Sequence, residues 1–279
     1  MKFRKLAIPY LIWMIVFIVM PLVLVFFYSV TGGMIKDFNI ENFTLENYRR
    51  FLTPQYLKVL FQSLKMALIT TVFCLIIGYP TAYWIFSSKS KYKSVMLLLI
   101  VIPMWMNFLL RTYAWVLILS KNGILNNFLG IFGIEPLNLI YTNKAIMIGM
   151  VYNYLPFMIL PIYSVFEKID KSMIEAAQDL GATETQAFWK IIFPMSISGV
   201  ITGITMVFIP AISTFEISAL LGGNKYNLIG NIIENQYRLV GDWNFGSAMS
   251  IVMILLIIVA MMITNKFDSE DEKSGGGLL

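Results

Sequence analysis

Two charged side chains lie within or directly after long apolar stretches of this 279-residue chain, and they are the first candidates for functional residues. Arg111 interrupts the apolar residues 94–120, and Glu216 follows the charge-free residues 191–215. A charged group in a membrane-spanning segment is costly and by default indicates a functional site. The chain has no histidine and one cysteine, Cys74, which excludes a disulfide framework, a thiolate metal cluster and histidine catalysis within the chain. We therefore expect binding and ion pairing at these positions.

The elements that must position these residues are membrane helices. Hydrophobic residues make up 58% of the chain and charged residues 13%, against about 45–50% and about 25% in soluble domains. Roughly 20 consecutive apolar residues cross the hydrocarbon core, and continuous apolar runs, unlike alternating ones, argue against a β-barrel. We predict an all-α membrane protein of about six transmembrane helices in one domain, residues 1–267, followed by a hydrophilic, disordered tail, 268–279. The predicted spans are 6–30, 60–86, 94–120, 143–166, 194–221 and 244–265.

Clusters of positive charge predict the orientation of the chain. One cluster precedes the first span, and a second lies in the short loop after the second span. Lysine and arginine next to membrane helices favour the cytoplasmic side. Six spans then place both the N- and the C-terminus in the cytoplasm. The cations concerned are Lys2, Arg4, Lys5, Lys89, Lys91 and Lys93.

The loop between the fourth and fifth spans, residues 167–193, is solvated and helical in character. Its apolar residues recur at three- and four-residue steps, which predicts a short amphipathic helix. Gly181 suits a left-handed turn that ends this helix, and Thr183 suits the cap of a second one, before the chain re-enters the membrane at Pro194. Such a shape can dock in a groove of a partner or lie on the lipid surface, and the periodicity alone leaves both open.

The amino-acid sequence of this loop resembles the EAA loop of the membrane subunits of bacterial ABC importers. That pattern reads Glu-Ala-Ala, three residues, Gly, nine residues, Ile, any residue, Leu, Pro. The matching residues are Glu175, Ala176, Ala177, Gly181, Ile191 and Pro194, and Phe193 stands where leucine is usual.

The resemblance extends along nearly the whole chain. The run from Arg111 to Trp115 and the run from Leu220 to Gly223, with Gly230 and Asn231 beyond it, are similar to spermidine/putrescine permease subunits of the B type. In one departure, the stretch from Ser213 to Ser218 lacks a proline often found there in that family.

The resemblance implies a type I ABC importer permease bundle, MetI-like, in the bacterial cytoplasmic membrane. It implies three kinds of partner: a dimeric cytoplasmic ATP-binding subunit that receives the EAA loop, a second homologous permease, and an extracytoplasmic polyamine-binding protein. The chain lacks the G-x-x-x-x-G-K-[ST] phosphate loop. We therefore expect a transport subunit, not an enzyme, with no cofactor of its own and with ATP and Mg bound by the partner ATPase; nothing implies a nucleic-acid partner.

For a polyamine, the expected lining is a carboxylate with aromatic faces, through ion pairing and cation–π contacts of about 0.5–2 kcal/mol each. Glu216 supplies the carboxylate, whereas Arg111 would repel a cation. Our hypothesis is that Arg111 pairs with an acid or a carbonyl in the bundle and sets the geometry of a gate. The predicted translocation-path residues are Trp105, Arg111, Tyr113, Trp115, Tyr152, Tyr154, Phe215 and Glu216.

Other functions remain open at this point. An ion-coupled secondary carrier would usually show internal repeats and buried acidic relays, and Glu216 is the one membrane-embedded acid that we predict. An intramembrane enzyme would need a cluster of catalytic side chains. A channel, or an ABC importer permease for another small solute, is not excluded by the sequence.

Overall fold

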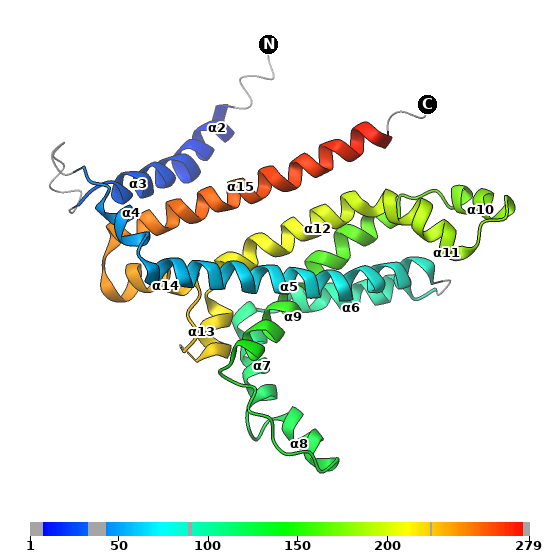
Figure 1. The fold of residues 1–279 in the computed structure, drawn as a ribbon, viewed down its shortest axis with the longest axis horizontal. Helices are drawn as coiled ribbons and strands as arrows, with labels where there is room; N and C mark the ends of the chain where they lie inside the picture. The colour runs from blue at the N-terminus through cyan, green and yellow to red at the C-terminus, as the bar shows by residue number, and fades with distance from the viewer. Residues whose placement is uncertain (1–7, 33–42, 89–90, 224, 276–279) are drawn as a thin grey trace.

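The computed structural model describes residues 8–32, 43–88, 91–223 and 225–275, and they fold into a bundle of helices (Figure 1). Lys2, Arg4, Lys5 and Lys89, which contributed to the predicted orientation, lie outside these ranges. Among the described residues, five helices are long and apolar enough to cross a membrane, and six are counted when one bent pair is taken as a single span. This agrees with the predicted all-α fold of about six spans.

The centre of the bundle is formed by α5 (Pro54–Ser87), α9 (Asn143–Phe166) and α12 (Phe193–Ser213), which all pack against one another, with α9 crossing the other two obliquely (Figure 1). Small residues allow the close approach of α12 and α9. A Cβ atom at Gly199 would lie 3.0 Å from the Cα atom of Ile162. Without a hydrophobic force between helices in lipid, such close backbone contacts are what hold membrane helices together.

The first span combines α2 (Ile8–Met14), a π-helical turn η1 (Ile15–Val19) and α3 (Met20–Ser29). It packs on α15 (Trp243–Gly275), which in turn packs on α12. Because the backbone of α15 is helical as far as Gly275, residues 268–275 differ from the disordered tail that the sequence predicted. Residues 276–279 lie outside the described residues.

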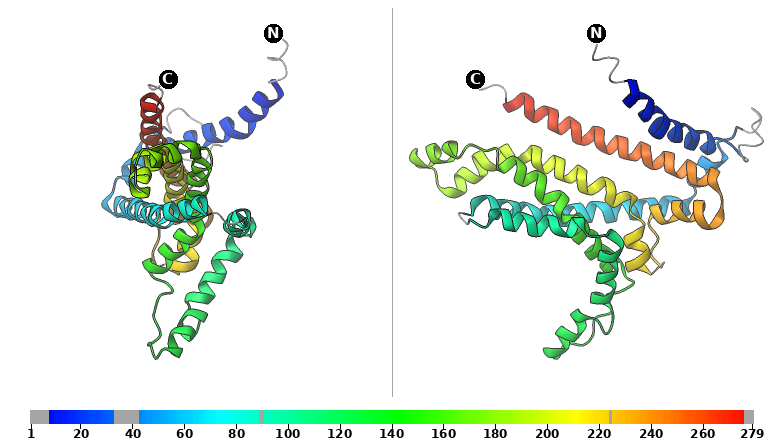
Figure 2. Two further views of the ribbon diagram at one scale, coloured as in Figure 1. Left: turned by 90° about the vertical axis from the view of Figure 1, so that its right-hand side faces the viewer. Right: turned by 180° about the vertical axis from the view of Figure 1, so that it is seen from behind.

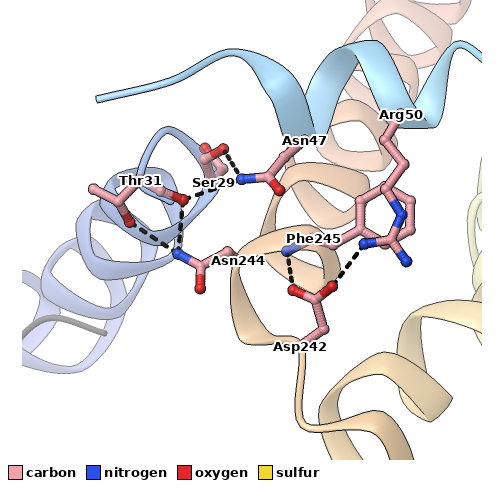
Figure 3. Close-up of polar contacts among 7 residues, drawn as sticks. All are labelled: Ser29, Thr31, Asn47, Arg50, Asp242, Asn244 and Phe245. Atoms are coloured by element: carbon pink, nitrogen blue, oxygen red, sulfur yellow. Dashed lines mark hydrogen bonds and ion pairs between the residues drawn. The ribbon is translucent and has the colours of Figure 1, made fainter. Parts of the chain in front are cut away.

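Polar side chains at one end of the bundle join the first and last spans to α4 (Glu46–Phe51), as Figure 3 shows. The guanidinium of Arg50 lies 2.7 Å from the Asp242 carboxylate and 4.0 Å from the centre of the Phe245 ring. The Asn244 amide donates to the carbonyl oxygen of Thr31 at 2.8 Å. These contacts fix where the chain enters and leaves its outermost pair of helices.

The predicted third span, 94–120, is not one continuous helix. It consists of α6 (Lys93–Trp105) and α7 (Phe108–Leu119), and the chain turns by 98° between α6 and the segment Phe108–Ile131, which ends with α8 (Ile124–Ile131). Asn107 accounts for the break, because its side chain accepts hydrogen bonds from the backbone of Leu109 and Leu110 and so caps a new helix. As a result, α7 and α8 project from the side of the bundle (Figure 2).

The predicted fifth span, 194–221, is also interrupted. Here α12 ends at Ser213, and a separate helix α13 (Glu216–Gly222) follows two non-helical residues. Asn231, in α14 (Ile229–Asn235), holds this junction, because its amide donates to the carbonyl of Phe215 at 2.8 Å and its oxygen accepts from the Ser218 hydroxyl and the Leu228 backbone. Asn231 therefore ties the start of α13 to α14. The chain reaches α15 through the π-helical turn η5 (Gln236–Val240).

Candidate functional site

The loop after α9 begins with α10 (Lys171–Asp179), which Asp170 caps. The Asp170 carboxylate accepts a hydrogen bond from the Ser172 backbone at 2.9 Å, and hydrogen bonding to Ser172 lowers the pKa of Asp170. Gly181 ends the helix with a φ of +88°, and the Ala182 backbone then donates to the carbonyl of Ala177 at 3.0 Å. This is the left-handed helix end that the glycine predicted.

A second short helix, α11 (Glu184–Ala187), follows, with Thr183 as its cap. The Thr183 hydroxyl accepts from the Gln186 backbone at 3.3 Å, and the Gln186 side chain accepts from the Thr183 backbone at 3.0 Å. This reciprocal pair is a capping box. The loop therefore has the predicted arrangement of a short helix, a glycine turn and another short helix, at the same end of the bundle as the C-terminal end of α5 (Figure 1).

The apolar residues of α10 divide between two faces. Ile174 and Ala177 are half-buried against the rest of the chain, whereas Met173, Ala176 and Leu180 are exposed, Leu180 by 90%. Glu175 is also exposed and forms no ion pair with the described residues. The loop thus presents an apolar strip next to a carboxylate, an arrangement suited to a partner groove with an apolar floor and a cationic edge.

Between α11 and α12 the backbone forms a π-helical turn, η4 (Phe188–Ile192), in which Phe193 donates to the carbonyl of Phe188. Pro194 explains the wider turn, because proline has no N–H and its ring crowds the carbonyl four residues earlier. The same relation holds in the first span, where η1 ends two residues before Pro21. The proline of the EAA pattern therefore sets the rotation of the residues just before it.

This rotation places Phe188 and Phe193 in a group of rings that sequence analysis missed. We call it the aromatic cluster. Tyr83 and Phe188 have ring centres 4.9 Å apart, Phe86 and Phe166 stack at 5.4 Å, and Tyr79 and Phe193 are 5.9 Å apart. Such pairs contribute about 0.5–1.5 kcal/mol each beyond their buried area. The members of the cluster are Tyr79, Tyr83, Phe86, Phe166, Phe188 and Phe193.

The aromatic cluster connects the loop to the centre of the bundle, because its rings come from α5, α9, η4 and α12. The spacing of 79, 83 and 86 on one helix face was the signal that could have found it. Phe193, the position where this chain departs from the usual leucine, supplies one of the rings. The aromatic cluster therefore joins the end of the loop to α5 and α9 by direct ring contacts.

A second candidate site lies where the two interrupted spans meet. A pocket of about 540 Å³ opens beside the α6–α7 break and the α12–α13 break. It brings together four of the predicted path residues, Arg111, Tyr154, Phe215 and Glu216. Its other lining residues, which sequence analysis missed, are Met104, Met106, Phe108, Asn153, Phe157, Pro210, Ser213 and Thr214.

The other four predicted path residues do not line this pocket. Trp105 is 81% exposed at the end of α6, and Tyr113 is exposed on α7. Trp115 and Tyr152 pack against each other with ring centres 5.1 Å apart. The 98° turn at Asn107 changes which face of the segment points inward, and hydropathy carries no information about that direction.

Arg111 is 7% exposed, and its guanidinium donates to the backbone carbonyl of Pro103, across the α6–α7 break. The guanidinium carbon lies 5.7 Å from the centre of the Phe108 ring and 5.9 Å from that of Tyr152. The partner is thus a carbonyl, one of the two kinds that our hypothesis allowed. Arg111 forms no ion pair with Glu216, although both line one pocket.

An interrupted helical bundle with an exposed helix–turn–helix loop and an internal pocket is the architecture of a membrane transport subunit. The family model of the binding-protein-dependent transport system inner membrane component matches residues 74–269, and the chain belongs to this family.

Three curated relatives are similar over almost their whole length. The chain is 40% identical over 253 residues to the spermidine/putrescine transport system permease protein PotB of Escherichia coli (strain K12), covering 90% of this chain and 92% of the relative. It is 39% identical over 265 residues to PotB of Haemophilus influenzae, covering 94% and 93%, and 39% identical to PotB of Salmonella typhimurium (strain LT2), covering 94% and 92%.

Solved structures of ABC importers share the fold. The structure of a bacterial ABC transporter involved in the import of the acidic polysaccharide alginate matches with a TM-score of 0.82 at 16% identity, over 96% of this chain and 95% of that chain. The MetNI methionine ABC transporter in an inward-facing conformation matches with a TM-score of 0.59 at 16% identity, over 77% and 95%. The fold is that of the membrane subunits of type I ABC importers.

Proposed function

We propose that the chain is a permease subunit of an ATP-driven importer of polyamines, spermidine or putrescine. The observation that carries this proposal is its 39–40% identity, over at least 90% of the chain, to curated spermidine/putrescine permeases. In this proposal the chain forms the translocation path together with a second homologous permease. An extracytoplasmic polyamine-binding protein delivers the substrate to the outer face, and the N- and C-termini lie in the cytoplasm.

Energy enters at the loop between α9 and α12. The exposed strip of Met173, Ala176 and Leu180 beside Glu175 docks in a groove of a cytoplasmic ATP-binding subunit, which functions as a dimer and binds ATP and Mg. Glu175 makes a charge-assisted contact with a cation of that subunit. Closure of the dimer on ATP moves the loop, and the aromatic cluster carries this movement to α5, α9 and α12.

Reconstitution tests the substrate assignment. The complex of this chain, its partner permease and its ATPase is placed in proteoliposomes with the binding protein, and vanadate-sensitive uptake of labelled spermidine and putrescine is measured. We expect ATP-dependent uptake of at least one of the two. Uptake that follows an imposed ion gradient instead of ATP would support an ion-coupled carrier, and ATP-driven uptake of another solute alone would retain the importer and reject the polyamine.

Co-purification tests the docking loop separately from the substrate. We expect the ATP-binding subunit to purify with the chain and to be lost on Glu175→Arg. The matched control is Glu184→Arg, which introduces the same charge at an exposed acid of the same loop that lies outside the Glu-Ala-Ala pattern. Equal loss with both variants, or retention with both, contradicts the proposed role of Glu175. A chain that purifies alone favours a carrier or a channel.

A further inference from the structure

Asn153 of α9 lines the 540 Å³ pocket and is 1% exposed. Its amide nitrogen donates to the backbone carbonyl of Gly149 at 2.8 Å, whereas its amide oxygen has no hydrogen-bond partner among the described residues. The orientation of the amide follows from this contact. A carbonyl can only accept, so the NH₂ group must face Gly149 and the oxygen must face away from it.

An amide oxygen that is buried without a donor is unfavourable, and native structures rarely contain one. Asn153 is a lining residue of the pocket, so a hydrogen-bond donor that enters the pocket can satisfy this oxygen. Arg111, on the same pocket, does not supply this donor: one guanidinium nitrogen donates to Pro103, and its Nε, which is itself buried without a hydrogen-bond partner in the described structure, makes no hydrogen bond to Asn153. The Arg111 guanidinium therefore holds the C-terminal end of α6, and the Asn153 amide oxygen stays without a donor in the described structure.

The remaining groups of the pocket define the chemistry of the donor. Glu216 is half-buried and forms no ion pair with a described side chain, so it supplies a carboxylate acceptor with negative charge. Tyr154, Phe157 and Phe215 supply aromatic faces, which attract cations. The volume of the pocket lies in the range of small-molecule binding sites.

We infer that this pocket binds a protonated amine, with the Asn153 amide oxygen and the Glu216 carboxylate accepting hydrogen bonds from the same ammonium group. Asn153 is then a specificity-determining residue of the translocation path, since it accepts N–H donors and rejects groups that have none to offer. The inference rests on the proposed function, because a polyamine is the amine that the relatives' names indicate.

Two substitutions separate this role from a purely structural one. Asn153→Ser removes the amide oxygen, yet its hydroxyl can still donate to Gly149, as Thr71 does to Ala67 and Thr112 does to Phe108 in their helices. Asn153→Asp keeps an acceptor in the pocket but cannot, when ionised, donate to Gly149. A ligand-binding role and a helix-stabilising role therefore predict opposite orders for the two variants.

The experiment measures the binding of labelled putrescine and spermidine to the assembled transporter complex in lipid nanodiscs by equilibrium dialysis. Uptake of the same amines is measured in proteoliposomes. We expect Asn153→Ser to weaken amine binding roughly ten- to a hundredfold, the range for a hydrogen bond to a charged group. Asn153→Asp should bind as tightly as the wild type or more tightly. The yield and thermal melting of each purified complex show whether it is folded.

The outcomes distinguish the inference from the proposed function. If the wild type binds and imports a polyamine and Asn153→Ser equals the wild type, water satisfies Asn153 and the inference is overturned while the polyamine function stands. Weakening by Asn153→Asp equal to or greater than that by Asn153→Ser also overturns it, because the helix contact is then what matters. If the wild type imports a different amine, the polyamine function is rejected, and the inference then stands only if Asn153→Ser binds that amine more weakly than Asn153→Asp does. Import of anionic or uncharged solutes alone overturns both proposals.

Discussion

The Tyr79 hydroxyl on α5 lies 2.9 Å from the Ser196 hydroxyl on α12, and Ser196 in turn donates to the backbone carbonyl of Phe193 at 2.8 Å. Because the Ser196 proton is used in the second bond, Tyr79 must donate in the first. The two bonds form a directed chain from the C-terminal third of α5 to the backbone just before Pro194. Tyr79 also belongs to the aromatic cluster, so ring packing and hydrogen bonding connect the loop to the same helix.

Tyr79→Phe removes this hydrogen bond and retains the ring. We expect it to destabilise the purified complex by about 0.5–1.5 kcal/mol, the usual net value of one hydrogen bond. We also expect less substrate transported per ATP hydrolysed, because α5 then follows the loop less closely. Thermal melting and the ratio of uptake to ATPase activity in proteoliposomes measure the two effects. Tyr83→Phe is the matched control, since no described hydrogen bond involves its hydroxyl; equal effects of both variants would show that the Tyr79–Ser196 bond does not matter.

Gly181→Ala tests the turn between the two short helices of the loop. With φ at +88° and no neighbouring group within 4 Å of the place where a Cβ atom would lie, the cost is backbone strain alone, about 1–2 kcal/mol. We expect weaker retention of the ATP-binding subunit on a column, because the turn aims α10 at its partner. Gly130→Ala, also without a close neighbour but at an ordinary φ in α8, should leave retention unchanged. Unchanged retention with Gly181→Ala would mean that the turn is not needed for docking.

The sequence predicts the membrane spans well and the breaks within them poorly. Both results follow from relying on hydropathy, which measures only the length of apolar chain. A bilayer imposes a length of apolar chain, so hydropathy finds each membrane helix, although α5 begins at Pro54, before the predicted span 60–86. Hydropathy does not weigh a single neutral cap such as Asn107 within an apolar run, and this residue turns the chain by 98°. The second interruption depends on Asn231, which lies far along the chain from Phe215.

The residues of the candidate sites likewise fall into those that the sequence could predict and those that it could not. The loop was predictable because its signals, Gly181 and Thr183, act on their own neighbours in sequence. Arg111 and Glu216 were found because a charge is conspicuous in an apolar run. Asn153 was missed because a neutral amide in a membrane helix usually satisfies itself within its own turn, and only the packed structure shows that half of this amide does not. The direction of a helix face is equally invisible to hydropathy, which is why the predicted path residues include side chains that lie outside the pocket.

Gly199→Ala and Gly203→Ala test the crossing of α12 and α9. A Cβ atom at Gly199 would lie 3.0 Å from the Cα atom of Ile162 and 3.1 Å from the carbonyl oxygen of Pro161, and backbone atoms cannot move aside. At Gly203 the nearest atom, at 2.7 Å, is the sulfur of Met158, whose flexible side chain can adjust. We expect Gly199→Ala to cost about 1–3 kcal/mol of stability, the range for overpacking, and Gly203→Ala to cost less. Thermal melting of the purified complex checks the order, and the reverse order would contradict this account of the crossing.

Arg111→Met and Arg111→Lys test whether the guanidinium fixes the bend between α6 and α7. Both variants keep a long side chain, but only Lys keeps a charged donor for the carbonyl of Pro103. A charge-assisted hydrogen bond contributes about 1.5–3 kcal/mol, enough to hold two short helices that no continuous backbone ladder connects. We therefore expect the angle between α6 and α7 to become variable in Arg111→Met and to remain narrow in Arg111→Lys.

Spin labels can measure that angle. Leu99 on α6 and Leu110 on α7 are largely exposed, and the native thiol, Cys74, is buried, so labels attach to cysteines introduced at the first two positions. Pulsed electron–electron double resonance on the labelled complex then gives the distribution of distances between the two spin labels. A broader distribution in Arg111→Met than in Arg111→Lys is the expected result. Identical distributions in the wild type and Arg111→Met would show that Asn107 alone sets the bend, and Arg111 would then have to be explained by what enters the pocket.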